Sequence, residues 1–210
     1  MIRPSKGPYA SNFFFVVKKD QKLRPVQDYQ PLNKWTKKDR NVLPLIPEVI
    51  DQLSGFTCFT KFDIQWGYNN VHIKEGDEWK AAFLTKQGLF KLLVMFFGLM
   101  NSLATFQQMM NTIFREEVSQ GWLSVYMDDL AIHTKPEAGK TEEKHWQRHH
   151  NDIHHILDKL EEYDLYLKPE KCEFKLEQME YLGIIVGLNT LQMDKKKTDQ
   201  VEGLAQPRNI

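Results

Sequence analysis

Val125-Tyr126-Met127-Asp128-Asp129-Leu130 places two adjacent acids between the apolar residues of a predicted strand. Acidic residues are depleted in strands, so the presence of two acids at this point requires a structural or functional explanation. Side chains alternate across a strand, and Asp128 is therefore expected to share a face with Tyr126. An isolated Asp-Asp pair is more often a turn than a site, because Asp favours turns. The segment 123–134 thus predicts a strand, a turn and a second strand, with both acids at the turn.

A second apolar stretch, Phe59-Thr60-Lys61-Phe62-Asp63-Ile64, also carries an acid. Buried like charges repel each other and persist only when they are neutralised, which bound cations do. Three carboxylates on adjoining strands suit two Mg²⁺ ions, because magnesium prefers hard oxygen ligands and leaves positions for substrate phosphates. Two such ions can activate a 3′-hydroxyl and stabilise departing pyrophosphate. We therefore expect Asp63, Asp128 and Asp129 to converge on a shared metal site.

The hydrophobic pattern elsewhere predicts strands and helices that alternate without the regular spacing of βαβ units. Helices are expected where apolar residues recur three or four positions apart. The predicted strands are 13–17 (buried), 23–29, 56–64, 81–85, 89–96 and 181–186, and the predicted helices are 47–54, 101–119 and 141–163. This order favours an α+β fold with helices packed on one sheet.

Composition allows a nucleic-acid enzyme without requiring one. The 210 residues are 41% apolar, enough for the core of one large domain or two joined subdomains. Residues 1–40 hold ten basic and three acidic side chains, although the net charge of the chain is zero. This distribution suits phosphate binding beside a carboxylate centre, and a solvated charged surface explains it equally well. No stretch is apolar enough to span a membrane, and Cys58 and Cys172 fit reduced thiols in an intracellular protein.

A histidine-rich helix raises the alternative of a zinc site. Pairs four residues apart occur among His145, His149, His150, His154 and His155. The segment has no cysteine, and no acidic residue is well placed on the same helix face to act as a third ligand. We therefore expect a solvated helix instead.

Tyr126-Met127-Asp128-Asp129 has the form Tyr-X-Asp-Asp, the signature of reverse transcriptases, and the chain resembles the enzymes of gypsy-type LTR retrotransposons. The resemblance runs in family order over nearly the whole chain. It is carried by Ile2–Lys6, Pro8–Ser11, Lys22–Val26, Leu43–Ile46, Gln52–Gly55, Phe97–Leu99, Ala104–Gln107, Leu167–Cys172 and Tyr181–Gly183. Two further segments, Trp66–Asn70 and Met95–Gly98, are similar to variants found in fungal elements.

This resemblance implies a polymerase right-hand fold with fingers and palm subdomains and an antiparallel palm sheet. The fingers would comprise 1–38 and 71–101, and the palm 39–70 and 102–194. Residues 195–210 would start the thumb or connection, so the chain is expected to be truncated before the thumb and ribonuclease H.

The implied function is that of an RNA-directed DNA polymerase, which adds dNTPs to a primer 3′-hydroxyl by a two-metal mechanism with Mg²⁺, or Mn²⁺ as an alternative. The implied partners are an RNA or DNA template with its primer, dNTPs and the ribonuclease H, integrase and protease of a retrotransposon polyprotein. No membrane partner is expected, and the implied location is a cytoplasmic particle or the nucleus.

The resemblance also assigns roles to single residues. Asp63 and Asp128 would be the principal metal ligands, and Asp129 would complete the triad. Tyr68 matches the residue beneath the incoming sugar that rejects a 2′-hydroxyl, and Arg24 matches the fingers arginine on the triphosphate. The remaining implied contacts are Lys18, Lys19, Phe97, Tyr126 and Met127 to the substrate, and Tyr181, Leu182 and Gly183 to nucleic acid near the primer.

The sequence departs from the gypsy-type pattern at three positions: Phe96 and Leu103 replace prolines, and Gln21 replaces a turn glycine, which could strain that turn. Two other functions stay open. An RNA-templated RNA polymerase shares the palm, but usually centres on Gly-Asp-Asp, and Tyr68 argues for deoxynucleotides. A catalytically inactive retroelement remnant would bind nucleic acid at most.

Overall fold

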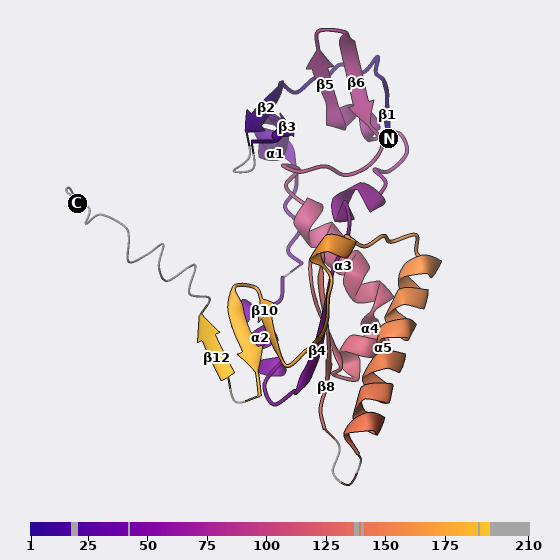
Figure 1. Cartoon of the computed structure of the whole chain (residues 1–210). Helices are drawn as coiled ribbons and strands as arrows, with labels where there is room; N and C mark the ends of the chain where they lie inside the picture. The colour runs from indigo at the N-terminus through magenta and orange to yellow at the C-terminus, as the bar shows by residue number, and fades with distance from the viewer. Residues whose placement is uncertain (18–20, 42, 137–138, 140, 189, 194–210) are drawn as a thin grey trace, which may run out of the picture. The chain divides into compact units, whose positions relative to one another are not determined.

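The computed structural model describes residues 1–17, 21–41, 43–136, 139, 141–188 and 190–193 (Figure 1). The chain divides into two compact units, the first made of Met1–Leu43 with Trp66–Met110 and the second of Pro44–Gln65 with Asn111–Ile210. The predicted breaks between fingers and palm, after residues 38, 70 and 101, differ from these boundaries by five to nine residues. The assignment of fingers and palm to these ranges stays a prediction, and the segment expected to start the thumb lies outside the described residues.

The first unit contains two small antiparallel sheets and short helices. Its three-stranded sheet has the order β1-β6-β5, with β1 at Ile2–Pro4, β5 at Ala82–Thr85 and β6 at Gly88–Leu92. The other sheet is a hairpin of β2 (Phe13–Val17) and β3 (Leu23–Gln27). The helical segments are α1 (Gln30–Trp35), η1 (Gly67–Asn70), η2 (Glu78–Ala81) and the larger part of α3 (Ser102–Ile113).

A small core fixes the first unit around Tyr29, which is buried with Ala81, Phe83 and Leu92. Half-buried aromatic and aliphatic side chains, among them Phe13 and Phe96, pack against this cluster. Aromatic burial contributes most of the stabilisation in so small a core, because each ring removes a large apolar area from water.

The strand at Phe13–Val17 was predicted to be buried, and this prediction is wrong. Phe14, Phe15, Val16 and Val17 are all exposed, because β2 pairs only with β3 in a two-stranded sheet. Gln21, at the turn after β2, has a φ of 62°, in the left-handed region that glycine adopts at less cost. The strain anticipated there is therefore present in the backbone.

The second unit is built on a four-stranded antiparallel sheet with the order β7-β8-β4-β9. The strands are β4 (Cys58–Asp63), β7 (Leu123–Tyr126), β8 (Asp129–Thr134) and β9 (Glu173–Leu176). β4 is buried along nearly its whole length, with Phe59 and Phe62 fully enclosed. The strand that carries Asp63 is therefore central in the sheet and held on both faces.

The long helix α5 (Glu142–Glu162) covers one face of this sheet, and Figure 1 shows it beside β8. Ile153, Ile156 and Leu160 are its buried apolar residues, as their spacing predicts. The other face packs against the short helix α2 (Ile46–Gln52) and the sheet β10-β11-β12. Those strands are β10 (Gln178–Tyr181), β11 (Ile184–Gly187) and β12 (Thr190–Met193).

Two predicted elements break in the middle. The expected strand 181–186 contains a hairpin turn, because Leu182 and Gly183 have φ angles of 54° and 82° that reverse the chain between β10 and β11. Its second half, from Ile184, does form a strand, as part of β11. The expected helix 101–119 becomes α3 and α4 (Arg115–Ser119), separated at Phe114 with non-helical backbone angles. No helix among the described residues is long and apolar enough to cross a membrane.

Candidate active site

Asp63 and Asp129 are register partners at the last pair of β4 and β8. Directly opposite residues of an antiparallel pair project to the same face, so both carboxylates lie on the face that also carries Lys61. Alternation puts Phe62 and Leu130 on the other face, where both are fully buried. The strand pairing therefore brings together two acids that are distant in sequence.

Asp128 joins them through the turn between β7 and β8. Tyr126 pairs with Asp129, so Met127 and Asp128 are the two turn residues, and Met127 has a φ of 58°. The expectation that Asp128 shares a strand face with Tyr126 is wrong, because the turn interrupts the alternation and Asp129 takes that place. The backbone N–H of Ile64 donates to the carbonyl of Asp128 at 2.8 Å, which ties the turn to the end of β4.

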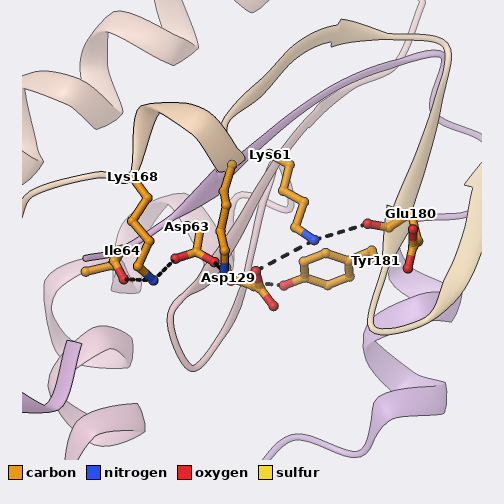
Figure 2. A network of polar contacts seen from close by, with 8 residues as sticks. Lys61, Asp63, Ile64, Asp129, Lys168, Glu180 and Tyr181 are labelled. Atoms are coloured by element: carbon orange, nitrogen blue, oxygen red, sulfur yellow. Dashed lines mark hydrogen bonds and ion pairs between the residues drawn. The ribbon is translucent and has the colours of Figure 1, made fainter. Parts of the chain in front are cut away.

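Ammonium groups contact Asp63 and Asp129 in this structure (Figure 2). Lys168 donates to Oδ1 of Asp63, and Lys171 donates to Oδ2 of Asp63 at 2.8 Å. Lys61 forms an ion pair with Asp129 at 3.7 Å and also donates to the carbonyl of Glu180 at 3.2 Å. Both lysines on Asp63 come from the segment around the 3₁₀ turn η3 (Pro169–Lys171).

The pKa values of Asp63 and Asp129 shift in opposite directions. Burial acts to raise the pKa of Asp63, but the hydrogen bonds from Lys168 and Lys171 outweigh it and lower that pKa below its usual value. Burial raises the pKa of Asp129, and the negative charges of Asp128 and Asp63 add to the rise against the effect of Lys61. Asp128 and Asp63 both raise the pKa of Asp129, so their negative charges lie close enough to repel that of Asp129. A bound cation would reduce this repulsion.

The donor set fits a divalent cation chemically, since three carboxylates supply the hard oxygen ligands that such ions prefer. Across the described parts of the chain, however, no three side chains of His, Cys, Asp or Glu lie together in positions that would hold one ion. In this structure both oxygens of Asp63 accept hydrogen bonds from ammonium groups. Cation binding at Asp63 would therefore displace these ammonium groups.

Tyr181 is a core residue that contacts the backbone of Asp129. Its side chain is fully buried, and its hydroxyl donates to the backbone carbonyl of Asp129 at 3.1 Å. Burial raises the pKa of this phenol well above its usual value, and the charge of Asp129 adds to the rise. The Tyr181 side chain is thus enclosed in the core, whereas the turn residues Leu182 and Gly183 are half-buried.

The residues predicted to contact the nucleotide meet within the first unit. The Tyr68 ring lies 5.1 Å from the ring of Phe97 and 5.3 Å from that of Phe106, centroid to centroid. The Arg24 guanidinium lies 5.7 Å from the centre of the Phe97 ring. Phe97 thus touches both Arg24 and Tyr68, and Tyr68 is half-buried rather than enclosed in the core.

Other predicted contacts have separate surroundings. Tyr126 and Met127 are half-buried beside the carboxylates, within the β7–β8 hairpin. Lys18 and Lys19 lie outside the described residues.

Sequence reasoning missed a buried polar network on the opposite face of the sheet. His149 of α5 is fully buried, and its two ring nitrogens contact the hydroxyls of Thr60 at 2.8 Å and Thr134 at 2.7 Å. The prediction of a solvated histidine helix is wrong at this position, since His149 precedes Ile153 by four residues on the apolar stripe. Burial lowers the pKa of His149 to about 4 and that of the equally enclosed His133 to about 3.

Most of the chain matches one known protein family. Residues 16–186 match the family described as "Reverse transcriptase (RNA-dependent DNA polymerase)". The chain belongs to the reverse transcriptase family. Members of this family are nucleotidyltransferases that use divalent metal ions.

Curated relatives place this reverse transcriptase domain among retrotransposons. The Transposon Tf2-3 and Tf2-7 polyproteins of Schizosaccharomyces pombe are each 35% identical over 209 residues, which is 100% of this chain. The chain spans 15% of the length of these relatives. The resemblance to LTR retrotransposon reverse transcriptases is confirmed.

Solved structures confirm the α+β fold of polymerase fingers and palm. A foamy viral protease-reverse transcriptase in complex with an RNA/DNA hybrid matches with a TM-score of 0.82, covering 99% of this chain and 26% of that chain. A related structure in complex with double-stranded DNA matches with a TM-score of 0.87, covering 99% of this chain and 34% of that chain. Sequence identity is 18% in both cases, so these matches establish the fold alone.

Proposed function

We propose that this domain extends a primer 3′-hydroxyl with dNTPs on an RNA or DNA template, with Asp63, Asp128 and Asp129 as its catalytic carboxylates. The observation that carries the proposal is the pairing of Asp63 with Asp129, with Asp128 in the adjoining turn, inside a chain of the reverse transcriptase family. The foamy viral structures with an RNA/DNA hybrid and with double-stranded DNA support a template–primer duplex as the ligand.

The three carboxylates would hold two Mg²⁺ ions, or Mn²⁺ as an alternative. Such ions supply activation of the attacking hydroxyl and stabilisation of the leaving pyrophosphate. The protein contributes by fixing its ligands: β4 and β8 hold Asp63 and Asp129 in register, and the bond from Ile64 to the carbonyl of Asp128 holds the turn. Tyr181 keeps the Asp129 backbone in place from within the core.

The residues of the first unit would select the nucleotide. Arg24 would bind the triphosphate, since its guanidinium suits phosphate geometry, with Lys18 or Lys19 as further cations. Tyr68 would lie beneath the sugar, supported by Phe97 and Phe106. Tyr126 and Met127 would line the site at the hairpin, and the Leu182–Gly183 turn would contact the primer. The relatives support a polyprotein origin. Ribonuclease H, integrase and protease would be the partner domains of such a polyprotein.

A second candidate function is a remnant that binds nucleic acid without catalysis. The specific observation in its favour is that lysines, rather than a group of three metal ligands, surround Asp63. The two candidates differ in one respect that can be measured, namely turnover of nucleotide.

Primer extension on RNA and DNA templates, with dNTPs or NTPs and with Mg²⁺ or Mn²⁺, tests the proposal. We expect dNTP incorporation on RNA that is lost in Asp128→Asn and retained in Asp77→Asn, a matched change at an exposed ion pair of the first unit. Duplex binding without extension would support the remnant, and a preference for NTPs would indicate an RNA polymerase.

A further inference from the structure

The segment that contains Lys168 is fixed to the end of β4 by the backbone. The N–H of Lys168 donates to the carbonyl of Asp63 at 2.9 Å, and the N–H of Gln65 donates to the carbonyl of Tyr166 at 2.6 Å. Ile64 and Leu167 form an antiparallel bridge between these two bonds. Lys168 therefore starts from a fixed backbone position beside Asp63.

The Lys168 side chain contacts two acceptors at the strand end. Its ammonium group donates to Oδ1 of Asp63 and to the backbone carbonyl of Ile64, the latter at 3.3 Å, as Figure 2 shows. Asp63 is 7% exposed, so this contact is shielded from water on most sides. An ion pair in such surroundings interacts more strongly than one on the surface.

We propose that Lys168 is a positioning residue that holds the carboxylate of Asp63 in the absence of metal and competes with the metal ion for it. The inference rests on the proposed function, because it assumes that Asp63 is a metal ligand. One oxygen cannot fully satisfy an ammonium group and a divalent cation at once, since the two positive charges repel. Metal affinity is then set partly by how readily Lys168 leaves Asp63.

Lys168 is better placed for this role than Lys171. The side chain of Lys168 is 23% exposed, against 57% for that of Lys171, so Lys168 is more confined. Lys171 reaches the other oxygen of Asp63 from the η3 turn as a more solvated group, whose displacement costs less. Lys168 also keeps an acceptor after displacement, because its contact with the Ile64 carbonyl does not use Asp63.

The competition predicts two effects of opposite sign when the Lys168 charge is removed. Metal binding tightens, because no ammonium group has to be displaced from Oδ1. The metal-free protein becomes less stable, because Asp63 loses a charged partner within an enclosed site. A lysine that only supported the fold would lower stability without tightening the binding of metal.

The test is Mn²⁺ binding to the purified chain, followed by the electron paramagnetic resonance signal of free Mn²⁺, together with thermal unfolding with and without Mn²⁺. Lys168→Met keeps the length of the side chain and removes its charge. We expect its Mn²⁺ Kd to fall at least about fivefold, and its deficit in unfolding temperature to shrink at saturating Mn²⁺. Lys168→Arg, which keeps the charge, and Lys80→Met, which removes the exposed Lys80–Asp77 pair, should bind Mn²⁺ like the parent chain.

Asp63→Asn separates failure of this inference from failure of the proposed function. If Asp63→Asn does not weaken Mn²⁺ binding, Asp63 is no metal ligand and the proposed site fails. If binding depends on Asp63 but Lys168→Met leaves the Kd unchanged or raises it, only the competition is overturned. Should Lys168→Met not fold, Lys168→Gln takes its place, since it removes the charge and keeps an N–H donor at this position.

Discussion

Asp63 and Asp129 occupy directly opposite positions on β4 and β8, and each carboxylate has an ammonium neighbour. Like charges opposite each other in a sheet are destabilising unless cations offset them. The strands keep both acids in place at an energetic cost, and the lysines reduce that cost in the absence of metal.

Asp63→Asn should reduce primer extension by about two orders of magnitude or more, because it removes a charge aimed at the reacting centre. The fold should survive, since Asn is nearly isosteric and keeps an oxygen acceptor for Lys168. Steady-state extension assays and thermal unfolding check the two parts of this prediction. Asp77→Asn, in the exposed pair with Lys80, is the matched control and should behave like the parent chain.

Tyr68→Val should raise the incorporation of NTPs relative to dNTPs, because a smaller side chain would leave room for a 2′-hydroxyl. The relevant quantity is the ratio of kcat/KM values, since discrimination arises in the transition state. Phe106→Leu is an informative comparison, because it loosens the packing of Tyr68 without removing the Tyr68 ring. An unchanged ratio in an active Tyr68→Val enzyme would remove Tyr68 from sugar selection.

Arg24→Ala should raise the KM for dNTP about 10- to 100-fold, the value of one charge-assisted phosphate contact, and should change template binding far less. Arg24→Lys should recover only part of this loss, because an ammonium group lacks the planar fork and packs less well beside Phe97. Fluorescence anisotropy of a labelled duplex provides the binding measurement. Equal losses of nucleotide use and duplex binding would mark Arg24 as a contact to nucleic acid instead.

Acidification should destabilise the second unit before the carboxylates titrate. His149 and His133 have folded pKa values of about 4 and about 3, below the ordinary 6.5, so the unfolded state binds more protons as the pH falls below 6.5. Stability is therefore fully present above pH 6.5 and lost on the way down. Between pH 6.5 and 5 each histidine should lower the free energy of unfolding by about 1.5 kcal/mol.

Denaturant unfolding at a series of pH values measures this loss. His149→Gln should be less stable at neutral pH, by about 1–3 kcal/mol, because it disturbs the bonds to Thr60 and Thr134. It should also show a shallower pH dependence, whereas His150→Gln, on the exposed side of the same helix, should follow the parent chain. A parent chain equally stable at pH 6.5 and 5 would refute the account of the buried histidines.

The fold was predictable where a local pattern agreed with tertiary packing. The apolar stripe of α5 gave its limits closely, and the acid pair gave the hairpin of β7 and β8. The exposure of β2 could not be predicted from its composition, because it depends on how many strands pair with it. The turn at Leu182–Gly183 had a usable signal, since glycine between two apolar runs often marks a chain reversal.

The candidate site was predictable in its acids but not in its cations. Asp63 and the Asp128–Asp129 pair stand out because acids are rare in apolar strands. Nothing local marks Lys168 as the partner of Asp63, because the two residues meet only through the bridge between Ile64 and Leu167. The burial of His149 did have a signal, its spacing of four residues from Ile153 on the helix stripe.

The most direct test of the central claim is a crystal structure of the chain grown with Mn²⁺, examined by anomalous scattering at the manganese edge. The account predicts anomalous peaks bonded to oxygens of Asp63 and of Asp128 or Asp129, with Lys168 moved off Asp63. Saturating Mn²⁺ with no peak at these carboxylates, and with the lysine contacts on Asp63 intact, would contradict it.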